Sequence, residues 1–186
     1  MHDQSRKAIT LVLGGVRSGK SRYAQTLAAG VAPVAFVATA RPSDSDEEMR
    51  RKIERHRTDR HQDWKTIEEP LDLASVLAEQ GPNYRIIVVD CLTLYAANLL
   101  EVEHGNLLAV EERLQGFYTA LRSASCSVAL VSNEVGSGIV PAFPEGRTYR
   151  DLLGEINQRV ATIADTVLLM VAGLPLALKG TPEVLP

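Results

Sequence analysis

The sequence is poor in cysteine and contains no long apolar run. Cys91 and Cys126 are its two cysteines in 186 residues, and their spacing is not that of a metal-ligand pair. So few cysteines argue for reduced thiols and a reducing compartment. No apolar stretch reaches the roughly 20 residues that a membrane-spanning helix needs, and no signal-peptide core follows the first residues. We therefore expect a cytoplasmic protein without a membrane span.

An excess of positive charge and internal repeats are also missing. The formal net charge is −3, which gives no electrostatic reason to expect a nucleic-acid partner. A chain of this length without repeats is most simply one domain over residues 1–186, with room for a substantial core. The guanine-reading motif N-K-x-D is absent, since Glu134 follows Asn133. This absence weakens a GTPase-switch interpretation but leaves GTP open as a ligand.

A complete phosphate-binding motif is present near the start of the chain. It fits G-x-x-x-x-G-K-[ST] at every fixed position and consists of Gly14, Gly15, Val16, Arg17, Ser18, Gly19, Lys20 and Ser21. Its glycines allow backbone N–H groups to approach an anion, and the following helix adds its positive dipole end. Lys20 is expected on the β- and γ-phosphates, and the Ser21 hydroxyl on Mg²⁺. An incidental glycine-rich turn is the alternative, but a strand-like run before the motif and a helical stretch after it favour a phosphate loop.

Apolar runs that alternate with helical patterns predict the fold class. The runs are rich in Val, Ile and Leu and cover residues 9–13, 34–38, 85–89, 127–131 and 166–171. Continuous rather than alternating apolar runs are typical of strands buried on both faces of a parallel sheet. Helical patterns cover residues 21–29, 46–60, 71–79, 92–100, 107–124 and 149–164, and a short strand is expected at 64–68. This order predicts a three-layer α/β domain, with ligands beyond the carboxyl ends of the strands.

One acidic residue closes a predicted strand in the manner of a Walker B element. Asp90 ends the run 85–89, and an acid at that place binds Mg²⁺ directly or through water. The alternative is that Asp90 caps the following helix. The phosphate loop favours the metal role, because such a loop needs an acidic partner of this kind.

The stretch 54–60 places one histidine among arginines. His56 is preceded by Arg55 and followed by Arg57, Thr58, Asp59 and Arg60. Such a run is ordinarily a solvated basic helix end. In the functional alternative, a neutral imidazole attacks phosphorus while arginines hold the phosphates. His2, His61 and His104 have no comparable neighbours, and none forms a metal-ligand pair on a helix.

Taken together, these stretches resemble the bifunctional adenosylcobinamide kinase / adenosylcobinamide-phosphate guanylyltransferase family of cobalamin synthesis (CobU/CobP). The resemblance covers nearly the whole chain and rests on the phosphate loop, on residues 53–60 with Trp64, Thr66 and 68–70, on the loop 133–141, and on Arg147, Arg150, Asp151, Gly154, Asn157 and Gln158. It implies a P-loop NTPase (RecA-like) fold with a mainly parallel sheet, and a homotrimer.

The same resemblance implies two reactions. A kinase step phosphorylates adenosylcobinamide with ATP or GTP, and a transferase step moves GMP from GTP onto the product, giving adenosylcobinamide-GDP and pyrophosphate. The family's GMP-histidine intermediate falls on His56. Its nucleotide-binding positions fall on the phosphate loop and on Thr39, Ala40, Arg41, Arg57, Thr58, Asp59, Arg60, Glu68 and Asp90.

Three points stay open when only the sequence is considered. The glycine-rich loop 133–141 either shapes the corrinoid or nucleotide site or is a purely structural turn. His61 follows Arg60 where the family usually has proline, so the local turn is expected to differ. The rival functions are a P-loop kinase for another small metabolite, with a structural His56, and a nucleotide-dependent regulatory module that transfers no group.

Overall fold

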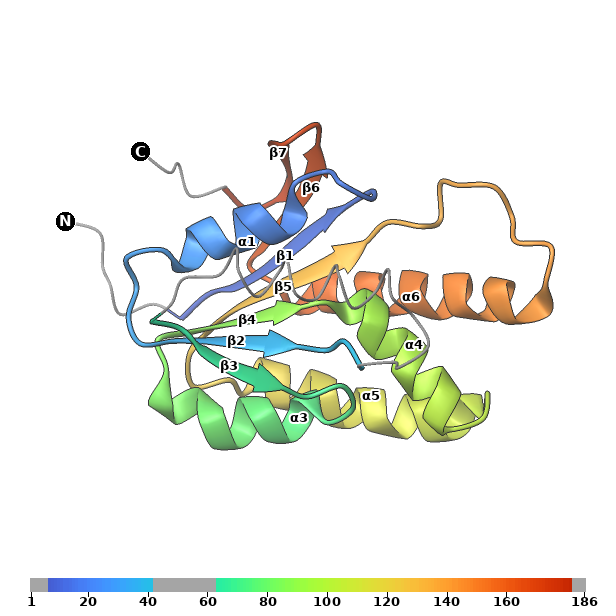
Figure 1. Cartoon of the computed structure of the whole chain (residues 1–186), viewed down its shortest axis with the longest axis horizontal. Coiled ribbons are helices and arrows are strands. Elements are labelled where there is room, and N and C mark those ends of the chain that lie inside the picture. The colour runs from blue at the N-terminus through green and yellow to red at the C-terminus, as the bar shows by residue number, and fades with distance from the viewer. Residues whose placement is uncertain (1–6, 42–62, 182–186) are drawn as a thin grey trace.

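The computed structural model describes residues 7–41 and 63–181. These residues form one seven-stranded sheet flanked by helices (Figure 1). Its strands are β1 (Ile9–Gly14), β2 (Val34–Ala38), β3 (Lys65–Glu68), β4 (Ile86–Asp90), β5 (Ser127–Asn133), β6 (Thr166–Val171) and β7 (Leu174–Lys179). They lie in the order β3-β2-β4-β5-β1-β6-β7, and all neighbours are parallel except β6 and β7. The predicted α/β class with a mainly parallel sheet is confirmed.

Five apolar runs and one short strand were expected, and each of the six is a strand. The strand β7 was not expected. Its six residues are all exposed, and although Leu174, Leu176 and Leu178 alternate along it, Pro175 interrupts the apolar run. A tight turn at Ala172 and Gly173, both with positive φ, folds β7 back on β6 as an antiparallel edge. Proline is tolerated there because an edge strand leaves half of its N–H groups unpaired.

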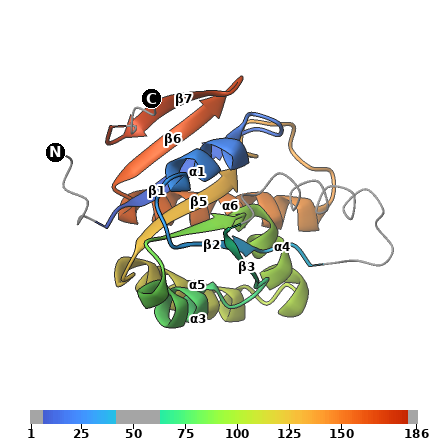
Figure 2. The ribbon, with the colours of Figure 1, turned by 60° about the vertical axis from the view of Figure 1, so that its left-hand side comes forward.

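The helices divide unequally between the two faces of the sheet (Figures 1 and 2). They are α1 (Lys20–Ala28), α3 (Leu73–Ser75), α4 (Leu92–Val102), α5 (Leu107–Arg122) and α6 (Pro144–Ile163). Ala24 and Ala28 of α1 pack on one face, against Val12 of β1 and its neighbours. The other four helices cover the opposite face, which Leu11 and Leu13 share. Alternate residues of a strand point to opposite faces, which accounts for this division along β1.

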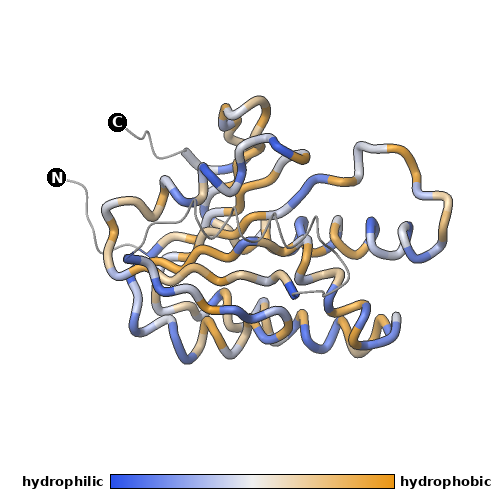
Figure 3. The backbone as a smooth tube through the Cα atoms, viewed as in Figure 1, coloured by the Kyte–Doolittle hydropathy of each residue, from blue (hydrophilic) through white to orange (hydrophobic). Residues whose placement is uncertain are grey.

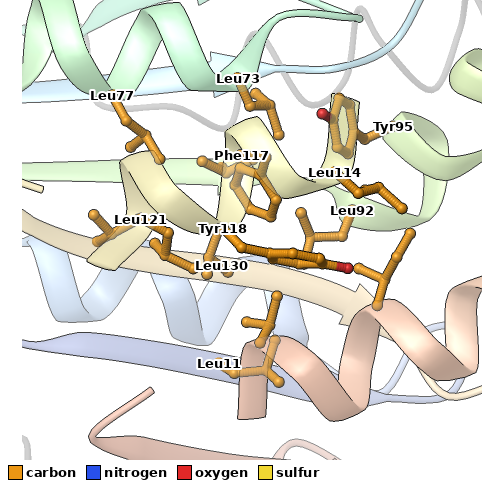
Figure 4. Close-up of a cluster of buried hydrophobic side chains, with 14 of the residues drawn as sticks. Leu11, Leu73, Leu77, Leu92, Tyr95, Leu114, Phe117, Tyr118, Leu121 and Leu130 are labelled. Atoms are coloured by element: carbon orange, nitrogen blue, oxygen red, sulfur yellow. The ribbon is translucent and has the colours of Figure 1, made fainter. Parts of the chain in front are cut away.

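Helix α5 fills the centre of the larger core (Figure 4). Its Phe117 lies edge-on to Tyr95 of α4, with ring centroids 5.6 Å apart, and Leu114 and Leu121 are fully buried beside it. Full burial of one such side chain stabilises the fold by roughly 1.5–3 kcal/mol. The hydropathy of the residues agrees with this core, because hydrophobic residues are concentrated in the central strands (Figure 3). Among the described residues, no helix is both long and apolar enough to cross a membrane.

Among the described helices, two boundaries differ from the sequence prediction by more than two residues. The segment expected at 71–79 is α3, and the winding continues as a π-helical turn over Val76–Gln80 and a 3₁₀ turn over Gly81–Asn83. Pro82 does not end this helical segment. It lies in the first turn of the 3₁₀ helix, where a backbone N–H has no partner within the helix and is not needed. Helix α6 begins at Pro144, five residues before the expected start, for the same reason.

Candidate nucleotide-binding site

The phosphate loop joins β1 to α1 at the carboxyl edge of the sheet, as predicted. Gly14 (φ 150°) and Gly19 (φ 97°) both have backbone conformations that L side chains rarely adopt. A Cβ on Gly14 would lie 2.6 Å from the Met170 carbonyl oxygen and from Ser18 Oγ. Gly15, by contrast, has nothing within 4 Å of its Cβ position. Two of the three glycines are therefore required by the loop itself, whatever it binds.

The first residue of α1 places an ammonium group against the loop. Lys20 is buried, and its Nζ donates a hydrogen bond of 2.6 Å to the Gly15 carbonyl oxygen. Ser21 follows it and is half-buried. Ser18 is also buried, and its Oγ makes no hydrogen bond within the described part of the chain. A hydroxyl, an ammonium group and helix N–H groups thus meet at one helix start, which is the chemistry that a phosphate requires.

The turn between β6 and β7 supports this loop from outside, and the sequence did not reveal that role. The Gly173 N–H donates to the Ser18 carbonyl oxygen at 2.9 Å. A Cβ on Gly19 would approach Gly173 Cα at 3.2 Å, so the two glycines lie close together. A glycine directly after a predicted strand indicates a turn. Nothing local, however, shows that the turn meets residues about 155 positions away in the sequence.

Asp90 lies at the same edge of the sheet, two strands from the phosphate loop. It ends β4, which is separated from β1 by β5. Neighbouring strands are about 4.8 Å apart, so the ends of β1 and β4 are separated by about 10 Å across the sheet. The N-cap residue of α4 is Cys91, and its peptide bond with Asp90 is cis. Asp90 is therefore not the N-cap residue of α4, and its role as a metal ligand stays a prediction.

The end of β2 is tied to the end of β4 through Thr39. This residue is fully buried, and its N–H donates to the Asp90 carbonyl oxygen at 3.2 Å. Its hydroxyl accepts from the Cys91 N–H at 2.7 Å and donates to the Cys91 carbonyl oxygen at 2.8 Å. Thr39 therefore fixes the backbone on both sides of the Asp90–Cys91 bond.

The remaining predicted nucleotide positions in the described residues gather beside Thr39. Ala40 and Arg41 continue from β2, and Glu68 ends the neighbouring β3. The Arg41 guanidinium forms an exposed ion pair with Glu101 at 3.2 Å, an interaction worth at most about 1 kcal/mol in water. His56, Arg57, Thr58, Asp59 and Arg60 lie outside the described residues, as does the predicted helix 46–60.

The Cys91 thiol beside this site is held in its neutral form. Burial, together with the negative charge of Asp90, raises the pKa of Cys91 to about 11. The thiolate is the reactive form of cysteine, so Cys91 is not a nucleophile near neutral pH.

The loop 133–141 leaves β5 next to the phosphate loop. Its Glu134 N–H donates to the Gly14 carbonyl oxygen at 3.1 Å, and the Glu134 carboxylate accepts from the Gly136 N–H at 2.6 Å. Arg150 of α6 donates to the Gly136 carbonyl oxygen at 2.6 Å. Ile139 is almost fully exposed, at 98%. The loop is thus held at its base and leaves apolar side chains in solvent.

An Mg²⁺ ion fits the donor chemistry of this edge. Ser21, in the first turn of α1, offers a hydroxyl, and Asp90, at the end of β4, offers a carboxylate; both residues are half-buried. Mg²⁺ prefers oxygen ligands and takes one or two carboxylates along with waters and phosphate oxygens. Two protein oxygens at this edge are in keeping with that preference.

Comparison with known proteins agrees with this geometry. Residues 10–178 match the family described as cobinamide kinase / cobinamide phosphate guanyltransferase (CobU). The bifunctional adenosylcobalamin biosynthesis protein CobP of Pseudomonas aeruginosa is 43% identical over 174 residues, which are 92% of this chain and 98% of the relative. The protein CobU of Escherichia coli K12, described in the same words, is 35% identical over 181 residues, 91% of this chain and 98% of its own.

A solved structure shares the fold at much lower identity. It is an ATPase from a bacterial type III secretion system, 11% identical, with a TM-score of 0.57. The likeness covers 91% of this chain but 56% of the ATPase. This likeness supports a P-loop ATPase fold and gives no information about the substrate.

Proposed function

Because the chain belongs to the cobinamide kinase / cobinamide phosphate guanyltransferase family of transferases, we propose that it phosphorylates adenosylcobinamide with ATP or GTP and then guanylylates the product from GTP. The observation that carries the kinase half is the complete phosphate loop, with Lys20 buried against it and Asp90 at the same sheet edge. The support for the transferase half is family membership together with the His56 block of the sequence. One domain, residues 1–186, carries both halves.

In the kinase step the loop binds and orients the triphosphate. The N–H groups of the loop and the Lys20 ammonium neutralise the β- and γ-phosphates, and Ser21 and Asp90 hold Mg²⁺. When bound, Mg²⁺ offsets the negative charge of the phosphate oxygens. The substrate hydroxyl oxygen attacks the γ-phosphorus, the bond to the β-phosphate oxygen breaks, and the hydroxyl proton and a nucleoside diphosphate are released. Positioning and charge neutralisation account for most catalysis of this type.

In the transferase step His56 forms a covalent intermediate. A neutral imidazole nitrogen attacks the α-phosphorus of GTP, and the bond to the β-phosphate oxygen breaks with its electron pair on pyrophosphate. Arg57 and Arg60 balance that charge. A phosphate oxygen of adenosylcobinamide phosphate then attacks the same phosphorus. The P–N bond breaks, its electron pair returns to the imidazole, and adenosylcobinamide-GDP is formed. Thr39, Ala40, Arg41, Thr58, Asp59 and Glu68 contact the nucleotide.

Covalent labelling tests the intermediate. The protein is incubated with Mg²⁺ and GTP labelled at the α- or the γ-phosphate, denatured, and assayed for bound label. We expect acid-labile α-label, no γ-label, and no label on a His56→Ala variant. Lys20→Ala is expected to damage both steps. If GTP binds but neither label is retained, the chain is a P-loop kinase or binding module instead.

The proposed assembly is a homotrimer in the cytoplasm, with no nucleic-acid partner. The edge strand β7 exposes Leu174, Leu176 and Leu178, by 72%, 57% and 57%, and an apolar edge of this kind favours contact with another chain. Light scattering on the purified protein measures the assembly directly, and a monomeric mass at assay concentration would reject it.

A further inference from the structure

A run of five apolar residues lies in the segment that joins β5 to α6. Its sequence is Ile139-Val140-Pro141-Ala142-Phe143, and Ile139, Val140 and Phe143 are exposed by 98%, 60% and 75%. Single apolar side chains are common on protein surfaces. A consecutive run of them in solvent, by contrast, ordinarily marks a surface that contacts a ligand or a partner.

The backbone of this run is held by the first turns of α6. Arg147 Nη1 donates to the Pro141 and Ala142 carbonyl oxygens at 3.0 and 2.8 Å. A Cβ on Gly146 would lie 2.8 Å from Pro141 Cβ, so the helix packs directly against the run. Because these contacts use the main chain and the proline ring, the other apolar side chains stay in solvent on a backbone that is already positioned. Such preorganisation lowers the entropy cost of binding a ligand.

The segment starts at the phosphate loop and leads outward from it. Asn133 ends β5 opposite Gly14, and the Glu134 N–H donates to the Gly14 carbonyl oxygen at 3.1 Å. The chain then projects beyond the carboxyl ends of the strands before it returns to α6 (Figure 1). In sheets of this kind ligands bind beyond these strand ends. The run 139–143 therefore lies on the side from which a phosphoryl acceptor approaches the phosphate loop.

We propose that the run 139–143 binds the corrin ring of adenosylcobinamide in the kinase step, an inference that rests on the proposed kinase function. The hydroxyl that is phosphorylated lies at the end of a flexible side chain of the corrinoid. When this hydroxyl reaches the γ-phosphorus, the ring itself remains outside the phosphate loop. Methyl groups line the ring, and their burial against apolar side chains is favourable. Arg147 is a positioning residue, since it holds the backbone of this surface.

The observations favour the corrinoid over two other occupants. A purine base presents hydrogen-bonding edges that need polar partners, and the side chains of residues 139–143 offer none. A second copy of the chain has the apolar edge strand β7 as its proposed contact, and β1 and β6 separate β7 from β5. Both alternatives remain distinct outcomes of the test.

The test measures recognition of the acceptor apart from that of the nucleotide. Ile139→Ser and Phe143→Ser each remove apolar surface at exposed positions, where the fold does not depend on them. For each variant, kcat and the KM for adenosylcobinamide and for GTP are measured, and GTP binding is titrated without the corrinoid. We expect the KM for adenosylcobinamide to rise about 10-fold, while kcat, the KM for GTP and the Kd for GTP stay within about twofold of the unaltered protein.

The positioning role of Arg147 is tested with two substitutions. Arg147→Ala removes both hydrogen bonds to the run and is expected to raise the KM for adenosylcobinamide, although Ile139 and Phe143 are still present. Arg147→Lys can still donate to a carbonyl oxygen, so it is expected to recover part of that loss. The KM for GTP should stay unchanged in both variants, which a general loss of structure would not allow.

Leu108→Ser is the matched control. Leu108 is 80% exposed in the first turn of α5, a helix whose buried side chains pack in the larger core. The substitution removes apolar surface of the same kind at a different place. We expect its KM for adenosylcobinamide to equal that of the unaltered protein.

Three outcomes would overturn the inference while leaving the proposed function intact. One is a KM for adenosylcobinamide within twofold of the unaltered protein in both serine variants. Another is an equal rise in the KM for GTP, which would assign the run to the nucleotide. The third is a smaller molar mass of the serine variants by light scattering, which would assign the run to a contact between copies. If the unaltered protein binds GTP but phosphorylates no adenosylcobinamide, the proposed function fails and the inference fails with it.

Discussion

Replacing Thr39 with valine tests whether its hydroxyl holds the backbone beside Asp90. Valine has nearly the same shape, so the packing of this fully buried position is kept. The Cys91 carbonyl keeps a second donor, the Tyr95 N–H at 3.1 Å, but the Cys91 N–H loses its 2.7 Å acceptor. An orphaned buried donor costs about 1–3 kcal/mol, and the second lost bond costs about 1 kcal/mol. Burial of the extra methyl group offsets about 0.8 kcal/mol of this.

The expected net loss is about 2 kcal/mol of unfolding free energy, or about 4–8 °C in Tm for a chain of this size. Urea denaturation at constant m-value measures the first quantity, and calorimetry the second. Kinase kcat should fall as well, because Asp90 directly precedes Cys91, whose backbone loses its two hydrogen bonds to Thr39.

Thr119→Val is the matched control. Its hydroxyl is exposed and donates to the Gln115 carbonyl oxygen within α5, so we expect a change within about 0.5 kcal/mol. If Thr39→Val has the same unfolding free energy as the Thr119→Val control, the two hydrogen bonds to Cys91 do not stabilise the fold by the amount expected here.

Two further predictions concern the glycine loop and the buried thiol. Gly14→Ala should destabilise the protein by about 2–5 kcal/mol, from backbone strain and from the 2.6 Å approach to the Met170 carbonyl oxygen. Gly15→Ala, with open space at its Cβ, should change urea stability by less than about 1 kcal/mol, and equal effects of the two substitutions would contradict this reasoning. Since burial raises the pKa of Cys91 from 9.0 to about 11, the unfolded chain releases that proton at lower pH than the native protein. Stability should therefore fall as pH rises through the window between about 9 and about 11, and a Cys91→Ala variant, compared by urea denaturation from pH 8 to 11, should show a shallower decline.

The sequence predicted the buried strands well because their apolar signal is local. Residues 34–38 and 166–171 are strands at the predicted bounds, since a strand covered on both faces reads as one continuous run. The exposed β7 was missed, because Pro175 interrupts its short apolar run. The start of α6 at Pro144 was also missed, because a proline at the first turn of a helix resembles a loop residue in the sequence.

In the candidate site, too, local motifs could be predicted from the sequence and long-range contacts could not. The phosphate loop and Asp90 are short motifs, and the structure brings them to one edge of the sheet as expected. The bonds that position them join residues far apart in the chain, such as Thr39 to Cys91 and Gly173 to Ser18. No local pattern encodes such pairs. His56 was assigned by family resemblance, and its place in the site stays a prediction.

The central position of β1 has a consequence for how the chain folds as it is synthesised. Residues 9–14 pair with residues 128–133 on one side and 166–170 on the other. About 155 residues that follow β1 therefore have to leave the ribosome before the strand that carries the phosphate loop gains both neighbours. Before β5 is made, the apolar residues of β1 have no neighbouring strand to join, and pairings over such sequence separations give the fold a high contact order. The phosphate loop therefore gains its full support late, from strands that are made long after its own residues.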